Sequence, residues 1–142
     1  MIREFETQDS DTVLTIWLEA SIKAHSFVPE KFWESKLDDM RNIYIPMSET
    51  WVYELDGELV GFFSLYQNTL AAIFVSPAQQ RKGIGKELLD IAKQLRKYFE
   101  LTAYSENTNS LGFYKKQDFS IVREQVDEHT GRKELLMEWK AE

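Results

Sequence analysis

Cysteine is absent from the 142 residues of the sequence. This absence excludes disulfide bonds, zinc sites built on thiolates, and cysteine nucleophiles. Proline and glycine are also sparse, with three and six copies scattered along the chain, and no stretch has the composition of a flexible linker. We therefore expect residues 1–142 to fold as a single domain, which at this length can bury a core without metal or disulfide support.

Long hydrophobic runs are missing as well. The longest apolar runs fall far short of the roughly 20 residues that a membrane-spanning helix needs. The first ten residues, MIREFETQDS, lack the apolar region of a signal peptide. We therefore expect a soluble, cytoplasmic protein that does not act in a membrane.

Positive charge is in deficit, because 17 Lys and Arg face 24 Asp and Glu, for a formal net charge of -7. Nucleic acids and anionic membranes bind proteins through an excess of Lys and Arg. Neither is therefore an expected partner. Cationic ligands such as amines suit this charge better.

The first third of the chain shows helical periodicity. A short strand is predicted at 2–6, and a helix follows the potential N-caps at 9–11. The pattern breaks at 25–27, and Pro29 opens a second helix in a region that ends at Pro46.

From residue 50 the apolar period changes from 3.6 to 2. Two strands, 50–55 and 58–66, flank Asp56-Gly57, a dipeptide typical of tight hairpins. The continuously apolar run LAAIFV (70–75) is predicted to lie in the middle of a sheet, covered on both faces. The remaining predicted elements are a helix after residue 83, a strand at 100–105, a short helix at 107–117, and a closing hairpin of 119–126 with 132–140. This order predicts a mixed α/β sheet with helices on both faces.

A basic turn, QQRKGIGKELL (79–89), connects the apolar run to the following helix. The free N–H groups and dipole of a helix start form an anion site that suits phosphate. Glycine lets phosphate oxygens approach the backbone and tolerates positive φ. The turn contains two glycines and three cations: Gly83, Gly85, Arg81, Lys82 and Lys86.

Two well-known phosphate loops do not fit this spacing. A dinucleotide fingerprint needs a third glycine where Leu88 stands. A Walker loop needs Ser or Thr where Glu87 stands, and glycine where Gln80 stands. The pattern that fits is Q-x-x-G-x-G at 80–85, although an ordinary strand-to-helix turn is the simpler alternative.

Two segments together resemble the GNAT superfamily of acyl-CoA-dependent N-acetyltransferases. FVSPAQQRKGIGKELL (74–89) resembles its central strand, pyrophosphate loop and following helix. SENTNSLGFYKKQDF (105–119) resembles a later segment in which an asparagine, here Asn107, precedes a tyrosine, here Tyr114, by seven positions. The resemblance implies a single N-acetyltransferase domain with the GNAT α/β (α+β) fold. That fold has a mixed, mostly antiparallel sheet of about seven strands and about four helices.

The resemblance implies a function as well. The expected reaction is direct transfer of acetyl from acetyl-CoA to a primary amine, in a small molecule or in a protein (a lysine or N-terminus). No metal is expected, and the protein would be a monomer or homodimer. The alternative is a non-catalytic acyl-CoA-binding or interaction module on the same fold.

The resemblance also implies a cofactor site. In the family the central strand and the strand after the long helix splay apart, and the pantetheine arm of coenzyme A pairs with exposed main-chain groups. Asn107 would hydrogen-bond this arm. The other implied cofactor residues are Ile73, Phe74 and Val75 for the arm, and Arg81, Lys82, Gly83, Ile84, Gly85 and Lys86 for the pyrophosphate.

Tyr114 is the implied general acid for the leaving thiolate, with a buried core aromatic as the alternative. The N–H of Val75 would polarise the thioester carbonyl. Some members carry a glutamate where this chain has Thr102, so that base does not transfer. Glu106, Tyr104, His25 and ordered water all remain candidates.

The stretch AHSFVPEKFW (24–33) resembles the helical hairpin of small bacterial members. The resemblance implies that His25 and Phe27 border the acceptor pocket. A histidine at a helix end with a local partner is the simpler reading of His25. Asn107 can likewise serve as an N-cap, a role that is compatible with cofactor contact. Asp118 takes the place of a family glycine, and we expect it to adopt the left-handed conformation.

Overall fold

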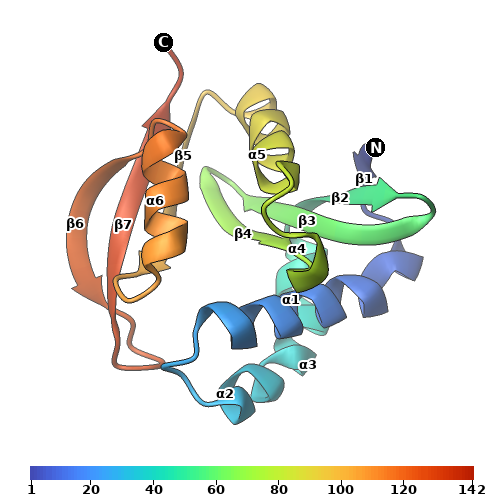
Figure 1. The fold of residues 1–142 in the computed structure, drawn as a ribbon, viewed down its shortest axis with the longest axis horizontal. Coiled ribbons are helices and arrows are strands. Elements are labelled where there is room, and N and C mark those ends of the chain that lie inside the picture. The colour runs from blue at the N-terminus through green and yellow to red at the C-terminus, as the bar shows by residue number, and fades with distance from the viewer.

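All seven strands form one sheet in the computed structural model, which describes residues 1–142 (Figure 1). The sheet order is β1-β2-β3-β4-β5-β7-β6. Every neighbouring pair is antiparallel except β4 with β5. This is the mixed, mostly antiparallel sheet that was predicted. The strands are β1 (Ile2–Glu4), β2 (Glu49–Leu55), β3 (Glu58–Tyr66), β4 (Thr69–Val75), β5 (Tyr98–Tyr104), β6 (Ser120–Val126) and β7 (Lys133–Lys140).

Helices cover both faces of the sheet (Figure 1). Adjacent residues of β3 show the two layers, because Phe63 belongs to the core under α5 while Phe62 belongs to the core under α1. Alternation of side chains along a strand explains this division. The longer helices are α1 (Ser10–Ala24), α2 (Glu30–Ser35), α5 (Ile84–Leu95) and α6 (Thr108–Lys116). The short helical turns are η1 (Thr7–Asp9), α3 (Leu37–Asp39), η2 (Met40–Tyr44), α4 (Ile45–Met47) and η3 (Pro77–Gln79).

Most predicted elements are confirmed, with differences at their ends. The Asp56-Gly57 hairpin joins β2 to β3, and Asp118 adopts the expected left-handed conformation with φ 72. The first strand is shorter than predicted and ends at Glu4. The helical region ends at Met47, one residue after Pro46, so its predicted end is off by a single residue.

The prediction that 70–75 lies in the middle of the sheet, with both faces covered, is confirmed in placement, but the burial is incomplete. Ile73 and Val75 pack against the core under α5, and Ala72 and Phe74 pack against the core under α1. Only Leu70 is fully buried, and the residues after it are half-buried or exposed. The cause is that β4 and β5 share only one parallel pair, Thr69 with Glu100. Beyond that pair the two strands separate, so the second half of β4 lacks a neighbour on one edge.

No helix in the structure has both the length and the apolar character needed to cross a membrane.

Candidate active site

The separation of β4 from β5 leaves main-chain groups of β4 facing a gap. The N–H of Ser76 donates to Val60 on β3 (2.7 Å), whereas the carbonyl of Val75 points elsewhere and accepts from Gln80 Nε2 (3.0 Å). Main-chain groups alternate in direction along a strand. The polar groups of Val75 and Ile73 therefore face the gap, and those of Phe74 face β3.

The carbonyl of Phe74 points toward β3. That oxygen lies 3.1 Å from the place that a Cβ on Gly61 of β3 would occupy. Of the three predicted main-chain contacts on β4, two lie on the open edge, and Phe74 is already engaged with β3.

The basic loop, residues 79–86, enters α5 through a left-handed conformation. Arg81 has φ 65 and Gly83, the N-cap of α5, has φ 85. No side chain caps this helix. The first helix-closing bond runs from Glu87 N to Gly83 O (3.1 Å), so the preceding N–H groups have no intrahelical acceptor and are available to an anion.

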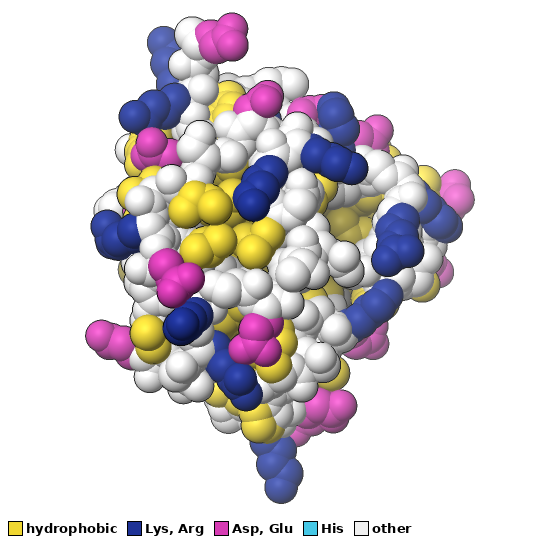
Figure 2. Space-filling model, turned by 60° about the vertical axis from the view of Figure 1, so that its left-hand side comes forward, with side chains coloured by type: hydrophobic (Ala, Val, Ile, Leu, Met, Phe, Trp, Pro, Cys, Tyr) yellow, Lys and Arg dark blue, Asp and Glu magenta, His cyan; other side chains and the backbone are white.

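Cations surround this helix start, and one of them was missed by sequence reasoning. Lys23, near the end of α1, brings its Nζ within 3.4 Å of Gln80 Oε1. Lys82 Nζ contacts Gln79 Oε1 at 3.1 Å, and Lys86 pairs with Asp90 at 2.9 Å. Lys23 is 57 residues away from Gln80 in the chain, so no local pattern identifies it. Figure 2 shows a hollow with hydrophobic side chains inside it and Lys and Arg side chains near it.

The two segments that resemble the GNAT superfamily, 74–89 and 105–119, meet at Gly85. A Cβ on this glycine would lie 3.7 Å from Phe113 Cζ on α6 and 3.9 Å from Val75 Cγ2 on β4. Gly85 is therefore the point where the end of β4, the start of α5 and the middle of α6 come together. Tyr114 follows Phe113 on α6, next to this junction.

Tyr114 is half-buried and packs against the core under α5. Its ring centroid lies 5.4 Å from that of Phe113 and 5.5 Å from that of Phe119. Burial raises the pKa of its hydroxyl above the ordinary value of 10.0. The hydroxyl therefore keeps its proton at neutral pH.

Asn107 caps α6, as its alternative interpretation predicted. Its Oδ1 accepts from Ser110 N at 3.3 Å, and the residue is 9% exposed. Its Nδ2 lies 3.4 Å from His25 Nε2. The structure thus brings Asn107 and His25 together, although they are 82 residues apart.

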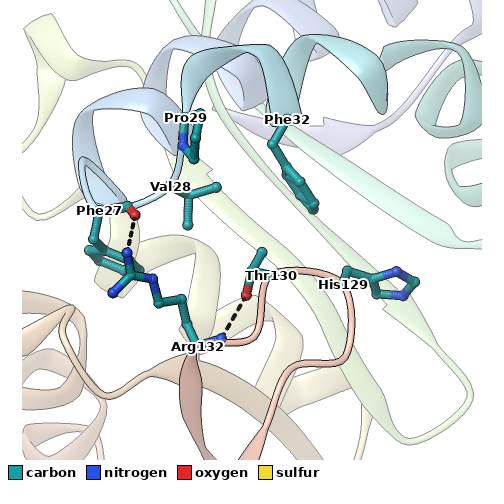
Figure 3. Close-up of a pocket in the computed structure, with 7 residues that line it drawn as sticks. All are labelled: Phe27, Val28, Pro29, Phe32, His129, Thr130 and Arg132. Atoms are coloured by element: carbon teal, nitrogen blue, oxygen red, sulfur yellow. Dashed lines mark hydrogen bonds between the residues drawn. The ribbon is translucent and has the colours of Figure 1, made fainter.

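Phe27 lines a cavity of about 250 Å³ between the α1–α2 loop and the β6–β7 loop (Figure 3). We call it the Phe27 cavity. Arg132, in the β6–β7 loop, joins the two loops because it donates to Phe27 O at 2.9 Å. It also donates to Glu106 Oε1, in the β5–α6 loop, at 3.2 Å. His25 lies behind Phe27, is only 8% exposed and does not line the cavity. The cavity residues are Phe27, Val28, Pro29, Phe32, His129, Thr130 and Arg132.

The candidate bases occupy quite different environments. Burial lowers the pKa of His25 to about 4, and Glu106 pairs with Arg132. Burial raises the pKa of Tyr104, whose hydroxyl donates to Asp127. Thr102 is exposed and supplies no carboxylate.

Sequence reasoning also missed a carboxylate-lined cavity of about 440 Å³ at the β6–β7 loop. Asp127, Glu128 and Glu134 line it. Burial opposes the ionisation of Asp127, but hydrogen bonds led by that from Tyr104 outweigh it and lower the pKa of this carboxyl. The cavity therefore carries negative charge at neutral pH. No motif marks these residues, because a loop assembles them.

Comparisons with known proteins agree with this geometry. Residues 10–141 match the family model described as acetyltransferase (GNAT) domain. The chain is 34% identical over 140 residues to peptidyl-lysine N-acetyltransferase YiaC of Escherichia coli (strain K12), covering 98% of this chain and 96% of YiaC. It is 29% identical over 129 residues to peptidyl-lysine N-acetyltransferase YjaB of Salmonella typhimurium, covering 89% and 88%. Among solved structures, the PaiA N-acetyltransferase of Thermoplasma acidophilum in complex with coenzyme A matches the fold with a TM-score of 0.81, at 20% identity and 99% and 98% coverage.

Proposed function

The chain belongs to the GNAT acetyltransferase family and is an acyl-CoA-dependent N-acetyltransferase; we propose that it acetylates lysine side chains of proteins, with acetyl-CoA as donor. The observation that carries this proposal is the separation of β4 from β5 after Thr69, next to the uncapped start of α5. The proposal treats residues 1–142 as a single N-acetyltransferase domain, because one sheet runs through them.

The residues around the gap fit coenzyme A. The free N–H groups at the start of α5 and the cations of the basic loop, with Lys23, would hold the pyrophosphate. The main-chain groups of Ile73 and Val75 would pair with the pantetheine arm as a further strand does. Asn107 would contact the same arm. Bound acetyl-CoA supplies a thioester whose acyl carbon accepts the amine.

Acetyl transfer then needs little from the side chains of the protein. The N–H of Val75 would donate to the thioester oxygen, where negative charge develops. The amine nitrogen forms a bond to the acyl carbon while the carbon–sulfur bond breaks. Tyr114 would give its proton to the departing sulfur and regain one from solvent. The hydroxyl carries its proton at neutral pH, as this role requires.

A water-mediated route fits the loss of the amine proton best among the candidates. His25 is buried, Glu106 is paired with Arg132, and the hydroxyl of Tyr104 donates rather than accepts. The exposed loops around the Phe27 cavity leave the acceptor side open to solvent. Water there would pass the proton to bulk solvent.

A protein lysine is favoured as acceptor over a small amine for two reasons. Relatives that align with 98% and 89% of this chain are named peptidyl-lysine N-acetyltransferases. The acceptor side also presents an ionised cavity lined by Asp127, Glu128 and Glu134, which attracts a basic side chain. Phe27 would contact the acceptor from the neighbouring cavity.

The test combines an acceptor panel with a tyrosine substitution. Purified protein and acetyl-CoA are incubated with lysine peptides or with small amines, and ε-N-acetylation is followed by mass spectrometry. Tyr114→Phe is expected to lower kcat for the peptide by about 100-fold or more, with unchanged affinity for coenzyme A. Tyr98→Phe is the matched control. It removes a tyrosine hydroxyl at the first residue of β5, and it should keep full activity. Acetylation of small amines alone would contradict the lysine acceptor, and full kcat in Tyr114→Phe would contradict the acid role.

A further inference from the structure

His25 makes a set of contacts that the proposed function does not use. It follows the last residue of α1, and aromatic rings enclose its imidazole on three sides. The ring centroids of Trp33 and Tyr104 lie 5.1 Å away, and that of Phe27 lies 5.8 Å away. Burial this complete prevents contact with an acceptor. It also keeps the ring neutral at pH 7, because the pKa is lowered to about 4.

The polar partner of the imidazole is Asn107. The Oδ1 of Asn107 is committed to the cap of α6, because it accepts from Ser110 N. The amide therefore presents its NH₂ end to His25, at 3.4 Å from Nε2. An NH₂ group only donates, so Nε2 must accept and the ring proton must sit on Nδ1.

The Nδ1 side of the ring is also closed to solvent. His25 Nδ1, Ser21 Oγ and Trp33 Nε1 are all buried without a protein hydrogen-bond partner. The ring of Trp33 packs against both His25 and Trp17, with centroids 5.1 Å and 5.9 Å away. The contact with Asn107 therefore decides the tautomer.

We propose that His25 is a positioning residue for acetyl transfer: its unprotonated Nε2 fixes the orientation of the Asn107 amide, and the amide fixes the start of α6, which carries Tyr114. If Nε2 did not accept, the amide could rotate and direct its NH₂ group at Ser110 N–H, so that two donors would face each other. The start of α6 would loosen, and Tyr114 would lose its fixed place between Phe113 and Phe119. This inference rests on the proposed roles of Asn107 and Tyr114.

The tautomer can be measured without any assay of activity. The chain has two histidines, so long-range proton–nitrogen NMR spectra of protein labelled with nitrogen-15 show two rings, and His129→Gln identifies the second. The titratable groups near His25 are Tyr104, whose ring packs on it, and Asp127, which accepts from Tyr104. We expect His25 to hold the Nδ1–H tautomer throughout about pH 5.5 to 8. An Nε2–H tautomer, or a charged ring at pH 7, would overturn the proposal.

Two substitutions separate positioning from packing. His25→Gln keeps an acceptor within reach of the Nε2 position, whereas His25→Phe keeps the ring and removes the acceptor. We expect Gln to keep kcat within about threefold and Phe to lower it about 10-fold, with a few-fold loss of coenzyme A affinity. In an Asn107→Ala background, His25→Phe should cause no further loss of kcat.

Val13→Ala controls for loss of stability, because it opens a cavity in the same core several turns away along α1. It should lower the melting temperature without changing kcat. Equal losses in His25→Gln and His25→Phe, or a loss in His25→Phe that persists without Asn107, would reject the positioning role. Failure of the proposed function would show separately, as full activity in Tyr114→Phe with the His25 tautomer unchanged.

Discussion

The cofactor side of the site consists mainly of main-chain groups, whereas the acceptor side consists mainly of side chains. On the cofactor side, main-chain groups of β4 and α5 lie within one continuous segment, and a left-handed glycine sets their direction. On the acceptor side, side chains from distant loops meet, as Arg132 does with Phe27 across 105 residues of sequence. The first side depends on backbone conformation, whereas the second depends on tertiary contacts that few local rules constrain. Substitutions should therefore have large, specific effects on the first and smaller, graded effects on the second.

The largest effect is expected from Gly83→Glu. A carboxylate at the N-cap of α5 would repel the pyrophosphate at the place that the free N–H groups create, and affinity for coenzyme A should fall by about 100-fold or more. Gly57→Glu is the matched control, since Gly57 has a similar φ of 82 and open space around it, in the β2–β3 turn. Isothermal titration calorimetry measures both. Equal losses in the two variants would mean that backbone strain rather than phosphate binding is responsible.

Acid should destabilise the protein through His25, which contacts Asn107 on the cofactor side and Phe27 on the acceptor side. Its pKa is about 4 in the folded state against an ordinary 6.5, so the unfolded chain binds the proton more readily. The contribution of the neutral His25 ring to the free energy of unfolding is fully present above pH 6.5. It is lost as the pH drops from 6.5 to about 4, and the loss is about 3 kcal/mol. The carboxyls of Asp9, Glu49 and Asp127, with lowered pKa values, add losses that begin below about pH 5 and continue below this window. Urea unfolding across the window should show this loss in the wild type and in His129→Gln, and a much smaller one in His25→Gln. A loss of equal size in all three would exclude His25 as the cause.

The sequence predicted the backbone of the cofactor side better than that of the acceptor side. Gly83 and Gly85 after an apolar run predicted a strand, a turn and a helix start, and β4, a left-handed turn and α5 are present there. The resemblance to the family supplied Asn107 and Tyr114, whose cofactor and acid roles stay predictions. The incomplete burial of β4 was not predicted, because an apolar run cannot show that the neighbouring strand β5 separates after one pair. Lys23 and Arg132 were missed for a related reason, since their partners are 57 and 105 residues away.

The smallest effect is expected on the acceptor side, from Arg132→Lys. This substitution keeps the charge but loses the planar group that reaches both Phe27 O and Glu106, so the two loops around the Phe27 cavity should separate slightly. KM for a lysine peptide should rise about threefold, while KM for acetyl-CoA and the melting temperature stay nearly unchanged, because the side chain is 45% exposed. Arg123→Lys on β6, whose guanidinium contacts only its neighbour Gln125, is the matched control. Steady-state kinetics with both substrates varied will separate the two constants. A rise confined to KM for acetyl-CoA would show that the Phe27 cavity belongs to the cofactor side and that the division into two sides is wrong.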